Sequence, residues 1–469
     1  MPLLSRAETQ FLRRHLNQVC HVTLDPAGPG VVRIHLVPNR HRVWEVPFVA
    51  ILNGRDILPL RVSWAILLAN FIEALHAHEG ETLTPEQRDA AARAAVEATA
   101  AVEATAAVYR KTPKEQIAAD LQSMMATLFA VAHGQTPPLG VQAMDLGAYA
   151  PHMTAPHRID LLVSAMVKDG AWHCNQKCLH CYAARQPYGA VEELDTDQWL
   201  AVIQKCRAAG VPQLTFTGGE PTLRHDLVKL VDAAQWFVTR LNTNGRMLTP
   251  ALCRELYEAS LDSVQVTLYS ADEATHNTLV GAAGFADTVA GIRSAVEAGL
   301  NVSINTPLCS LNRDYAATLT LAHSLGVRYA TCSGLIPAGR AESTASRATR
   351  LTPEELAGVL RTAQDAAARL DMELDFTSPG WLDDDTLRAL GFAQTPRCGA
   401  CLSNMAIAPD GTVLPCQSWL RGPALGNILH QPWRRIWGSP ACRRIRRQSA
   451  KMRPGCPLGS TPIQKEGKP

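Results

Sequence analysis

The chain has 469 residues, of which 46% are hydrophobic and 19% charged, and its formal net charge at pH 7 is +2. This composition is typical of globular material long enough for two or three domains, and the nearly balanced charge gives no general attraction to nucleic acid or membranes. No uninterrupted apolar run reaches about 18 residues, and the start, Met1-Pro2-Leu3-Leu4-Ser5-Arg6, lacks the apolar stretch of a signal peptide. We therefore expect a cytoplasmic protein with neither a nucleic acid nor a membrane as partner.

Residues 1–150 precede the motifs described below, and their pattern predicts an α+β N-terminal accessory domain. Two segments, Val31 to Leu36 and Val43 to Leu52, predict a pair of β-strands because hydrophobic residues alternate along them. A helix should follow, since apolar residues recur at helical spacing, namely Trp64, Leu67, Leu68, Phe71, Ile72 and Leu75. Two roles stay open for this domain, a structural cap on the next domain or a module that binds a peptide.

An alanine-rich helix is expected next, because Thr84-Pro85-Glu86-Gln87 has the form of a capping box. Within it, the six residues Val96 to Ala101 are repeated as Val102 to Ala107. A six-residue repeat drifts around a helix of 3.6 residues per turn, so it presents no constant face. We therefore predict that this helix is an exposed arm.

Residues 151–345 show a different pattern, in which short apolar strands alternate with amphipathic helices. Helices are expected at Asp197 to Ala209 and at Phe285 to Ala298. The alternation predicts an α/β domain with a parallel sheet. Its expected strands are Ile159 to Ser164, Gln213 to Phe216, Phe237 to Asn242, Ser263 to Leu268, Val302 to Thr306 and Tyr329 to Leu335.

A tight cysteine triplet follows the first of these strands, with the spacing C-x3-C-x2-C at Cys174, Cys178 and Cys181. Three thiolates on one loop can hold a [4Fe-4S] cluster and leave one iron without a protein ligand. A zinc knuckle is the alternative, but zinc sites pair a C-x2-C unit with a further Cys or His pair. Because the further Cys or His pair of a zinc site does not follow this triplet at such a spacing, we favour the cluster, whose open iron could bind a non-protein ligand.

Together with Tyr182 and with Thr217-Gly218-Gly219-Glu220-Pro221, the triplet resembles the radical S-adenosylmethionine (radical SAM) enzymes. The resemblance implies a partial (β/α)6 TIM-like barrel whose three cysteines ligate the cluster, while SAM fills the open iron site. In that family an electron from the cluster cleaves SAM to methionine and a 5′-deoxyadenosyl radical, which abstracts hydrogen from a substrate. It also implies an external electron donor such as flavodoxin or ferredoxin.

The resemblance further suggests which residues contact SAM. Gly218, Gly219 and Glu220 stand where relatives hold its amino group, and Tyr182 is expected on the adenine side. Thr267 takes the place of a hydroxyl residue, usually Ser, on the fourth strand of relatives.

For three further positions in this domain the sequence leaves the role open or departs from the family pattern. Some relatives place an Arg where Val280 stands, so Thr267 and backbone donors are expected to meet the SAM carboxylate instead. Asn305 is a candidate contact to ribose or substrate, or else a turn cap. Arg340, in Ile336-Pro337-Ala338-Gly339-Arg340-Ala341, resembles a turn of this subgroup, or is simply an exposed arginine.

Residues 346–469 carry a second cysteine group, with Cys398, Cys401, Cys416 and Cys456 as the expected ligands of one auxiliary [4Fe-4S] cluster. An Asp410-Gly411 turn should fold Cys416 back toward Cys401. The group is similar to the opening of a SPASM domain, in a shortened or twitch-like form, which occurs in radical SAM enzymes that act on peptides and protein-derived cofactors. We prefer Cys456 to Cys442 as the fourth ligand because Cys456 sits in a Pro/Gly turn.

These features predict a radical SAM enzyme that modifies a ribosomal peptide or a peptide-derived cofactor precursor. Heme-pathway relatives share this architecture, so a small-molecule substrate of the tetrapyrrole or sugar type is one alternative. The other is a non-enzymatic iron–sulfur redox or binding protein, against which the intact Gly218-Gly219-Glu220 argues. The sequence identifies no general base, and it names neither the substrate nor the bond formed.

Overall fold

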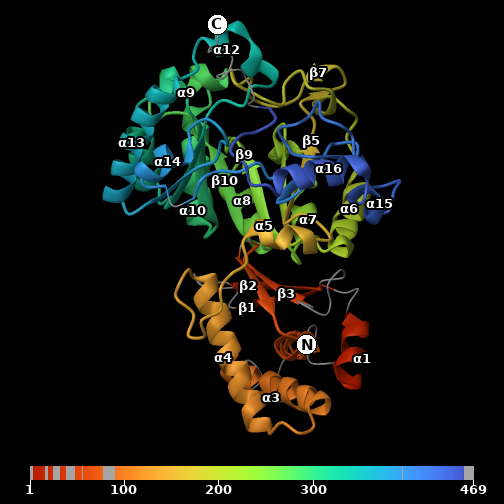
Figure 1. Cartoon of the computed structure of the whole chain (residues 1–469). Coiled ribbons are helices and arrows are strands. Elements are labelled where there is room, and N and C mark those ends of the chain that lie inside the picture. The colour runs from red at the N-terminus through yellow and green to blue at the C-terminus, as the bar shows by residue number, and fades with distance from the viewer. Residues whose placement is uncertain are drawn as a thin grey trace, which may run out of the picture. The chain divides into compact units, whose positions relative to one another are not determined.

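The computed structural model describes residues 4–15, 19–24, 32–38, 48–54, 56–77, 90–392 and 394–458 (Figure 1). The chain divides into two compact units. The N-terminal unit comprises Met1–His157 with Cys206–Pro212, and the C-terminal unit comprises Arg158–Lys205 with Gln213–Pro469.

A four-stranded antiparallel sheet in the order β1-β2-β3-β4 forms the centre of the N-terminal unit. The predicted strand pair is confirmed as β2 and β3, which pair antiparallel, while β1 and β4 were not predicted. Pro59 argues against a strand in the sequence, but β4 lies at the edge of the sheet, where a missing N–H is tolerated. The strands are β1 (Cys20–Leu24), β2 (Val32–Pro38), β3 (Phe48–Leu52) and β4 (Asp56–Leu60).

Helices complete the N-terminal unit, and the predicted apolar helix is confirmed as α2. The prediction of an exposed arm for α3 is wrong, because Ala101 is fully buried and Thr105 accepts a hydrogen bond from Asn70 of α2 at 2.9 Å. The expected capping box at Thr84 lies outside the described residues. The helices are α1 (Arg6–His15), α2 (Val62–His76), α3 (Ala90–Val108), α4 (Lys114–Ala132) and α5 (Leu146–Tyr149), with a 3-10 turn at Ala150–His152.

The C-terminal unit is built on a parallel sheet, and all six predicted strands are confirmed. A seventh strand, β13, was not predicted, since its four residues give too short an alternation to recognise. The parallel strands are β5 (Arg158–Ser164), β8 (Gln213–Gly218), β9 (Val238–Thr243), β10 (Ser263–Thr267), β11 (Asn301–Pro307), β12 (Tyr329–Ser333) and β13 (Glu373–Phe376), and a short hairpin is formed by β6 (Val167–Lys168) and β7 (Ala171–Trp172).

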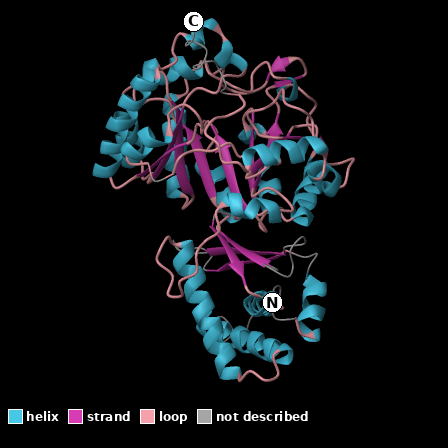
Figure 2. Cartoon of the chain, viewed as in Figure 1, coloured by secondary structure: helices cyan, strands magenta, loops and turns pink. Residues whose placement is uncertain are grey.

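Helices are arranged around these strands, as Figure 2 shows. The predicted helices at Asp197 to Ala209 and Phe285 to Ala298 are confirmed as α6 and α10. The helices are α6 (Thr196–Ala209), α7 (Leu227–Asp232), α8 (Pro250–Glu258), α9 (Glu273–Val280), α10 (Phe285–Glu297), α11 (Tyr315–Ser324), α12 (Thr344–Arg347), α13 (Pro353–Arg369), α14 (Asp384–Ala389), α15 (Trp433–Trp437) and α16 (Pro440–Ser449).

The sheet continues past β5 into the C-terminal cysteine segment, in the order β8-β5-β14-β15-β16. Strand β14 (Asn404–Ile407) pairs with β5 in parallel, and β15 (Thr412–Leu414) and β16 (Gly426–Asn427) follow antiparallel. The predicted turn is confirmed, with Gly411 at a φ of +83°, where glycine is favoured. The C-terminal cysteine segment is therefore joined, through β14, to the same sheet whose strand β5 precedes the cysteine triplet.

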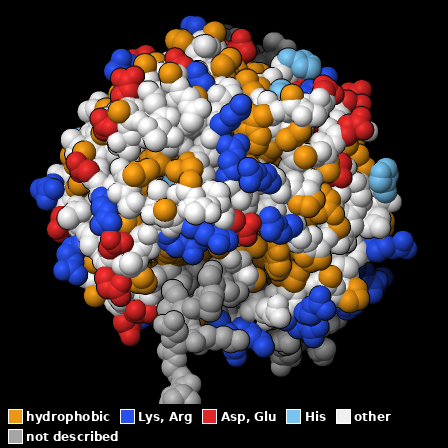
Figure 3. All heavy atoms as spheres, turned by 90° about the horizontal axis from the view of Figure 1, so that it is seen from above, with side chains coloured by type: hydrophobic (Ala, Val, Ile, Leu, Met, Phe, Trp, Pro, Cys, Tyr) orange, Lys and Arg blue, Asp and Glu red, His pale blue; other side chains and the backbone are white. Residues whose placement is uncertain are grey.

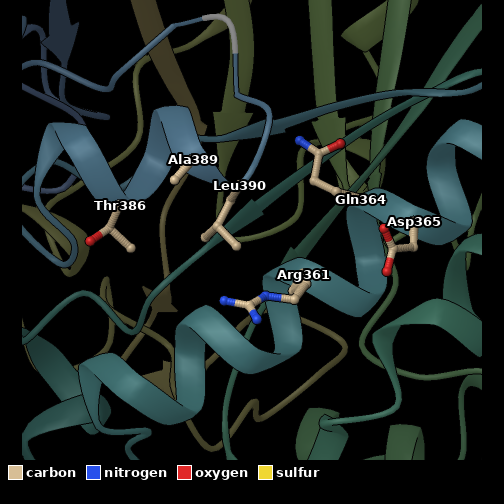
Figure 4. Close-up of a pocket in the computed structure, with 6 residues that line it drawn as sticks. All are labelled: Arg361, Gln364, Asp365, Thr386, Ala389 and Leu390. Carbon is tan, nitrogen blue, oxygen red and sulfur yellow. The ribbon is translucent and has the colours of Figure 1, made fainter.

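A pocket on α13 and α14 is lined by Arg361, Gln364, Asp365, Thr386, Ala389 and Leu390 (Figure 4). Among the described helices none is by itself long and apolar enough to cross a membrane, and α9 and α10 reach that length only as a pair bent by 98°.

Gly291 of α10 provides a test of how closely the helices pack on the sheet loops. Alanine normally stabilises a helix by about 1 kcal/mol relative to glycine. Here an added Cβ would lie 2.0 Å from the carbonyl oxygen of Gly245. We predict that G291A lowers the thermal unfolding midpoint, measured by circular dichroism.

The matched control is G358A in α13, where an added Cβ meets no atom within 4 Å. Helix propensity should act alone at that position, so G358A should raise the midpoint slightly. A G291A midpoint at or above that of the wild type would contradict the close packing.

Candidate active site

The predicted cysteine triplet lies on the loop after the β6–β7 hairpin, and all three side chains are half-buried. Burial, with a contribution from the neighbouring Cys181, raises the pKa of the Cys174 thiol to about 12. Burial also raises the pKa of Cys178, with Cys181 and Cys174 adding to the shift. Thiols that are close together and shielded from water ionise only beside a compensating cation, which the irons of a cluster provide. The three residues therefore fit a cluster.

The cysteine loop is held on one side by the end of α9. The backbone N–H of Lys177 donates to the carbonyl of Val280 at 2.9 Å, and that of Leu179 donates to Leu279 at 2.8 Å. Gly281 ends α9 with a φ of +63°, and a Cβ there would lie 2.7 Å from the carbonyl oxygen of Lys177. Val280 thus contributes through its backbone, and its buried side chain packs beside Cys178 in an apolar cluster.

Arg340, for which the sequence left open a turn of the subgroup or an exposed arginine, holds the other side of the loop. Its N–H donates to the carbonyl of Cys181 at 3.0 Å, and its guanidinium donates to that of Cys178 at 3.2 Å. The guanidinium also lies 4.1 Å from the centre of the Trp172 ring. Trp172 in turn donates to the carbonyl of Gln176 at 2.7 Å. Arg340 is therefore a positioning residue of the loop.

The end of β8 passes very close to the end of β5, and two glycines make this possible. Gly218 has a φ of +136°, and a Cβ there would lie 2.2 Å from the carbonyl oxygen of Ser164. The N–H of Gly219 donates to the same carbonyl at 2.8 Å. The Sγ atom of Cys174 lies 3.4 Å from the Gly219 carbonyl, so the Gly-Gly segment contacts the cysteine loop directly.

Glu220 is almost fully buried and its two oxygens accept hydrogen bonds from the protein itself. Oε1 accepts from the backbone N–H and the hydroxyl of Thr222 and from the hydroxyl of Thr243, and Oε2 accepts from the N–H of Asn244. Burial raises the pKa of this carboxyl, while the hydrogen bonds oppose the shift. Glu220 thereby ties the end of β8 to the end of β9, and its predicted contact with the amino group of SAM stays a prediction.

The remaining predicted cofactor contacts are spread over the sheet. Thr267 pairs with Asn305 across β10 and β11, and Asn305 accepts from the hydroxyl of Thr331 at 2.9 Å. Tyr182 packs in an apolar cluster with Leu414 of β15. Burial raises the pKa of Tyr182, and the charges of Cys181, Asp160 and Cys416 add to the shift. The cofactor contacts of all three residues stay predictions.

The C-terminal cysteine group brings five thiols together, the four predicted ligands and Cys442 of α16. Cys398 lies beside Cys456, and Cys401 lies beside Cys442, so that each thiol shifts the pKa of the other. Cys416 acts electrostatically on Cys401 and Cys456 and so lies near both pairs. The N–H of Cys401 donates to the carbonyl of Pro415 at 3.1 Å, which brings Cys416 back as the turn predicted.

Among the described residues no three His, Cys, Asp or Glu side chains converge as the ligands of a single metal ion. Figure 3, which views the molecule from the side where β7 and α12 lie in Figure 1, shows Lys and Arg side chains beside hydrophobic ones near the middle of the face.

Comparison with known families gives two matches in the order of the two cysteine groups. Residues 173–337 match the Radical SAM superfamily, and residues 398–457 match SPASM, an iron–sulfur cluster-binding domain. The chain is 31% identical over 304 residues to PqqA peptide cyclase of Ruegeria pomeroyi, which covers 62% of this chain and 76% of that protein. It is 28% identical over 303 residues to AdoMet-dependent heme synthase of Methanosarcina barkeri, and this match covers 60% of this chain and 84% of that protein.

Solved structures resemble the fold over more of the chain. SuiB of Streptococcus suis matches with a TM-score of 0.57 and 15% identity, covering 91% of this chain and 94% of SuiB. SuiB bound to its precursor peptide SuiA matches with a TM-score of 0.56 and 13% identity, covering 88% and 93%. The enzyme anSMEcpe with bound AdoMet matches with a TM-score of 0.50 and 14% identity, covering 62% of this chain and 83% of anSMEcpe. At these identities the likeness concerns the fold alone.

Glu220 offers a test of the β8–β9 connection. In E220Q the new amide N–H2 must face either the N–H of Thr222 or that of Asn244, and neither can accept a hydrogen bond. A buried donor without an acceptor costs about 1–3 kcal/mol, so the thermal unfolding midpoint should fall. E297Q, at an exposed position of α10, is the matched control and should leave the midpoint unchanged. Equal midpoints for both variants would show that the Glu220 hydrogen bonds do not form.

Proposed function

The chain belongs to the radical SAM superfamily and carries a SPASM domain, and from this premise we propose that it modifies a ribosomally made peptide. Membership makes it an enzyme that uses a [4Fe-4S] cluster with SAM and carries auxiliary iron–sulfur binding. The peptide substrate is suggested by PqqA peptide cyclase, the relative with 31% identity.

When bound, the cluster and SAM supply a 5′-deoxyadenosyl radical that abstracts a hydrogen atom from the substrate. We assign Cys174, Cys178 and Cys181 as the protein ligands of that cluster, since their thiols are close together and half-buried. Gly218 and Gly219 bring the backbone of β8 against the same loop, which positions carbonyl acceptors for an ammonium group. Tyr182, Glu220, Thr267 and Asn305 are proposed to complete the SAM and substrate contacts.

One observation carries the proposal: the sheet that bears the cysteine loop continues through β5 into β14 and β15. A substrate on this sheet would lie between two iron–sulfur sites. Removal of one hydrogen atom leaves a substrate radical that must lose a further electron to give an oxidised product. An auxiliary cluster on the same sheet is a suitable acceptor for that electron, or a ligand for the substrate.

For the auxiliary site we propose a single cluster held by Cys398, Cys401, Cys416 and Cys456. Cys456 lies beside Cys398, and the charge of Cys416 acts on Cys456, so three of the four lie close together. Cys442 instead lies beside Cys401 and accepts from Arg446 at 3.3 Å, on the α16 side of the group. An arginine that donates to the sulfur satisfies Cys442 without iron.

A small-molecule substrate of the tetrapyrrole type is the second candidate, favoured by the 28% identity to AdoMet-dependent heme synthase. Both candidates need an external electron donor, such as flavodoxin or ferredoxin. Both also need a reducing compartment, because thirteen free cysteines would otherwise be open to oxidation.

The test is to incubate anaerobically reconstituted protein with SAM, a reductant and one candidate substrate at a time. Short peptides encoded beside the gene form one set, and porphyrin precursors form the other. We expect 5′-deoxyadenosine in amounts that rise with a peptide, together with a peptide lighter by two hydrogen atoms. Stimulation by a porphyrin precursor alone would favour the second candidate. No 5′-deoxyadenosine from fully loaded protein would contradict radical SAM activity.

The auxiliary ligand set predicts different outcomes for two cysteine variants. C456S should lower the iron content and change the electron paramagnetic resonance spectrum of the reduced protein, because an iron loses its thiolate. C442S, the matched control in the same group, should keep the iron content of the wild type. If C442S lost iron and C456S kept it, Cys442 would be the ligand. If both variants lost iron, all five cysteines would be required.

A further inference from the structure

The parallel sheet of the C-terminal unit has one apolar and one polar face. Along β9 the residues Thr239, Leu241 and Thr243 are buried, whereas the alternate ones, including Arg240 and Asn242, are half-exposed. The same alternation runs along β10, where Val264 and Val266 are fully buried and their neighbours are not. We call the face that carries the half-exposed residues, such as Arg240 and Asn242, the inner face. The interior of a typical closed barrel is filled by branched apolar side chains, so a polar, partly open inner face is suited to hold a polar ligand.

Most polar groups on this face find partners among themselves. Asp160 is fully buried and pairs with the guanidinium of Arg158 at 2.9 Å. The amide of Gln265 donates across β11 to the hydroxyl of Thr331 at 3.2 Å. Tyr329 donates to Asp375 of β13 at 2.9 Å. Away from β8 and β9 most of these polar groups therefore have a partner on the same face, although Nε of Arg158 and Oδ1 of Asp160 face each other as an ion pair without a hydrogen bond.

Three neighbouring groups on β8 and β9 lack even an ion-pair partner among the described residues. Nε of Arg240, Oγ1 of Thr215 and Oδ1 of Asn242 are shielded from solvent and have no hydrogen-bond partner among the described residues. Arg240 pairs directly with Thr215 in the sheet register, and Asn242 lies two residues farther along the same strand. We call these three residues the β8–β9 patch. Buried polar groups without partners cost free energy, so their clustering marks a place where a partner is missing.

The charge of Arg240 indicates what kind of partner is missing. The ionisable neighbours that act on it are Arg158, Tyr329 and Asp160, and Tyr329 is neutral because burial raises the pKa of its phenol. Asp160 is already paired with Arg158, which leaves one uncompensated positive charge. Burial lowers the pKa of Arg240, and Arg158 lowers it further. A guanidinium in this situation is stabilised by a carboxylate, which it binds with two parallel hydrogen bonds.

We propose that the β8–β9 patch binds a carboxylate of the substrate peptide, held by Arg240 with support from the Thr215 hydroxyl and the Asn242 amide. The inference rests on the proposed function for the peptide and adds a preference for an acidic residue or a free carboxyl terminus at this point. Nothing in the ligation of either cluster depends on these three residues.

The patch lies on the β8 side of β5, within a short distance of both predicted iron–sulfur sites. Along β9, Arg240 is three residues from Thr243, which donates to Glu220, and so is about 10 Å from that edge of the sheet. Across the sheet, β8 is the second strand from β14 and β9 is the third. The distance from these two strands to β14 is therefore about 10–15 Å. Cys416 also feels the charge of Asp160 on the intervening β5. A carboxylate held here would fix the substrate where both sites can reach it.

The experiment measures which peptides the reconstituted full-length protein retains. Three pools of synthetic twelve-residue peptides share randomised flanks. The first has a central Glu and blocked ends, the second has a central Gln and blocked ends, and the third has a central Gln and a free carboxyl terminus. Retention on immobilised protein is quantified by mass spectrometry, and preference for the first or third pool tells the two carboxylate sources apart.

Wild-type protein should retain one carboxylate-bearing pool at about tenfold or more over the second pool, as expected for hydrogen bonds to a charged group. R240Q should lose this preference and R240K should keep some of it, because the lysine retains the charge. R254Q removes the same charge from an exposed position of α8 and should keep the preference. Variants are compared at equal iron content.

The outcomes separate this inference from the proposed function. Peptides retained equally from all three pools would overturn the carboxylate subsite and leave peptide binding in place. A preference that survives in R240Q would overturn the role of Arg240. Failure to retain any peptide would contradict the peptide function and the subsite with it.

Discussion

Strand β5 is hydrogen-bonded on both edges, and the organisation of the C-terminal unit depends on that double pairing. On one edge it pairs in parallel with β8, whose Gly-Gly end contacts the cysteine loop. On the other it pairs in parallel with β14, which begins the auxiliary cysteine hairpin. Backbone hydrogen bonds fix the register of both neighbours, so the two cysteine groups are held at a constant separation without any direct bond between them.

The loop that carries the three predicted cluster ligands has little regular structure of its own. It is instead tied at three places by groups far away in the sequence, namely the end of α9, the Gly339-Arg340 turn and the carbonyl of Gly219. Such support positions thiolates before iron arrives, which is what a site that must hold one iron open requires. Glu220 supports the neighbouring strand ends in the same way, because it joins β8 and β9 through four protein donors.

Features with a short-range signature could be predicted from the sequence. The C-x3-C-x2-C spacing, the six alternating strands and the Asp410-Gly411 turn each lie within a few residues, and they led to the fold and to both cysteine groups. Features that depend on distant partners could not. The role of Arg340 comes from carbonyls about 160 residues earlier, and the donors to Glu220 include residues 23 and 24 positions later.

Two errors in the N-terminal unit have the same origin. The alanine repeat in α3 gives no constant face, yet α3 is packed against α2 because small side chains permit close approach wherever they fall. Strand β4 contains Pro59, which argues against a strand unless the position is known to be an edge. In both cases the deciding neighbour is another element, which no local pattern reveals. Arg240 belongs to this class as well, since its lack of a partner appears only when the strands are assembled.

The central claim is that one sheet carries two separate iron–sulfur sites, and iron counting tests it most directly. Iron and sulfide are measured on anaerobically reconstituted wild-type protein and on the variant in which Cys174, Cys178 and Cys181 are all replaced by Ala. The account predicts about eight irons per chain falling to about four, with the remaining signal in electron paramagnetic resonance belonging to the auxiliary cluster. About four irons falling to none would contradict it, because the C-terminal cysteines would then hold no cluster.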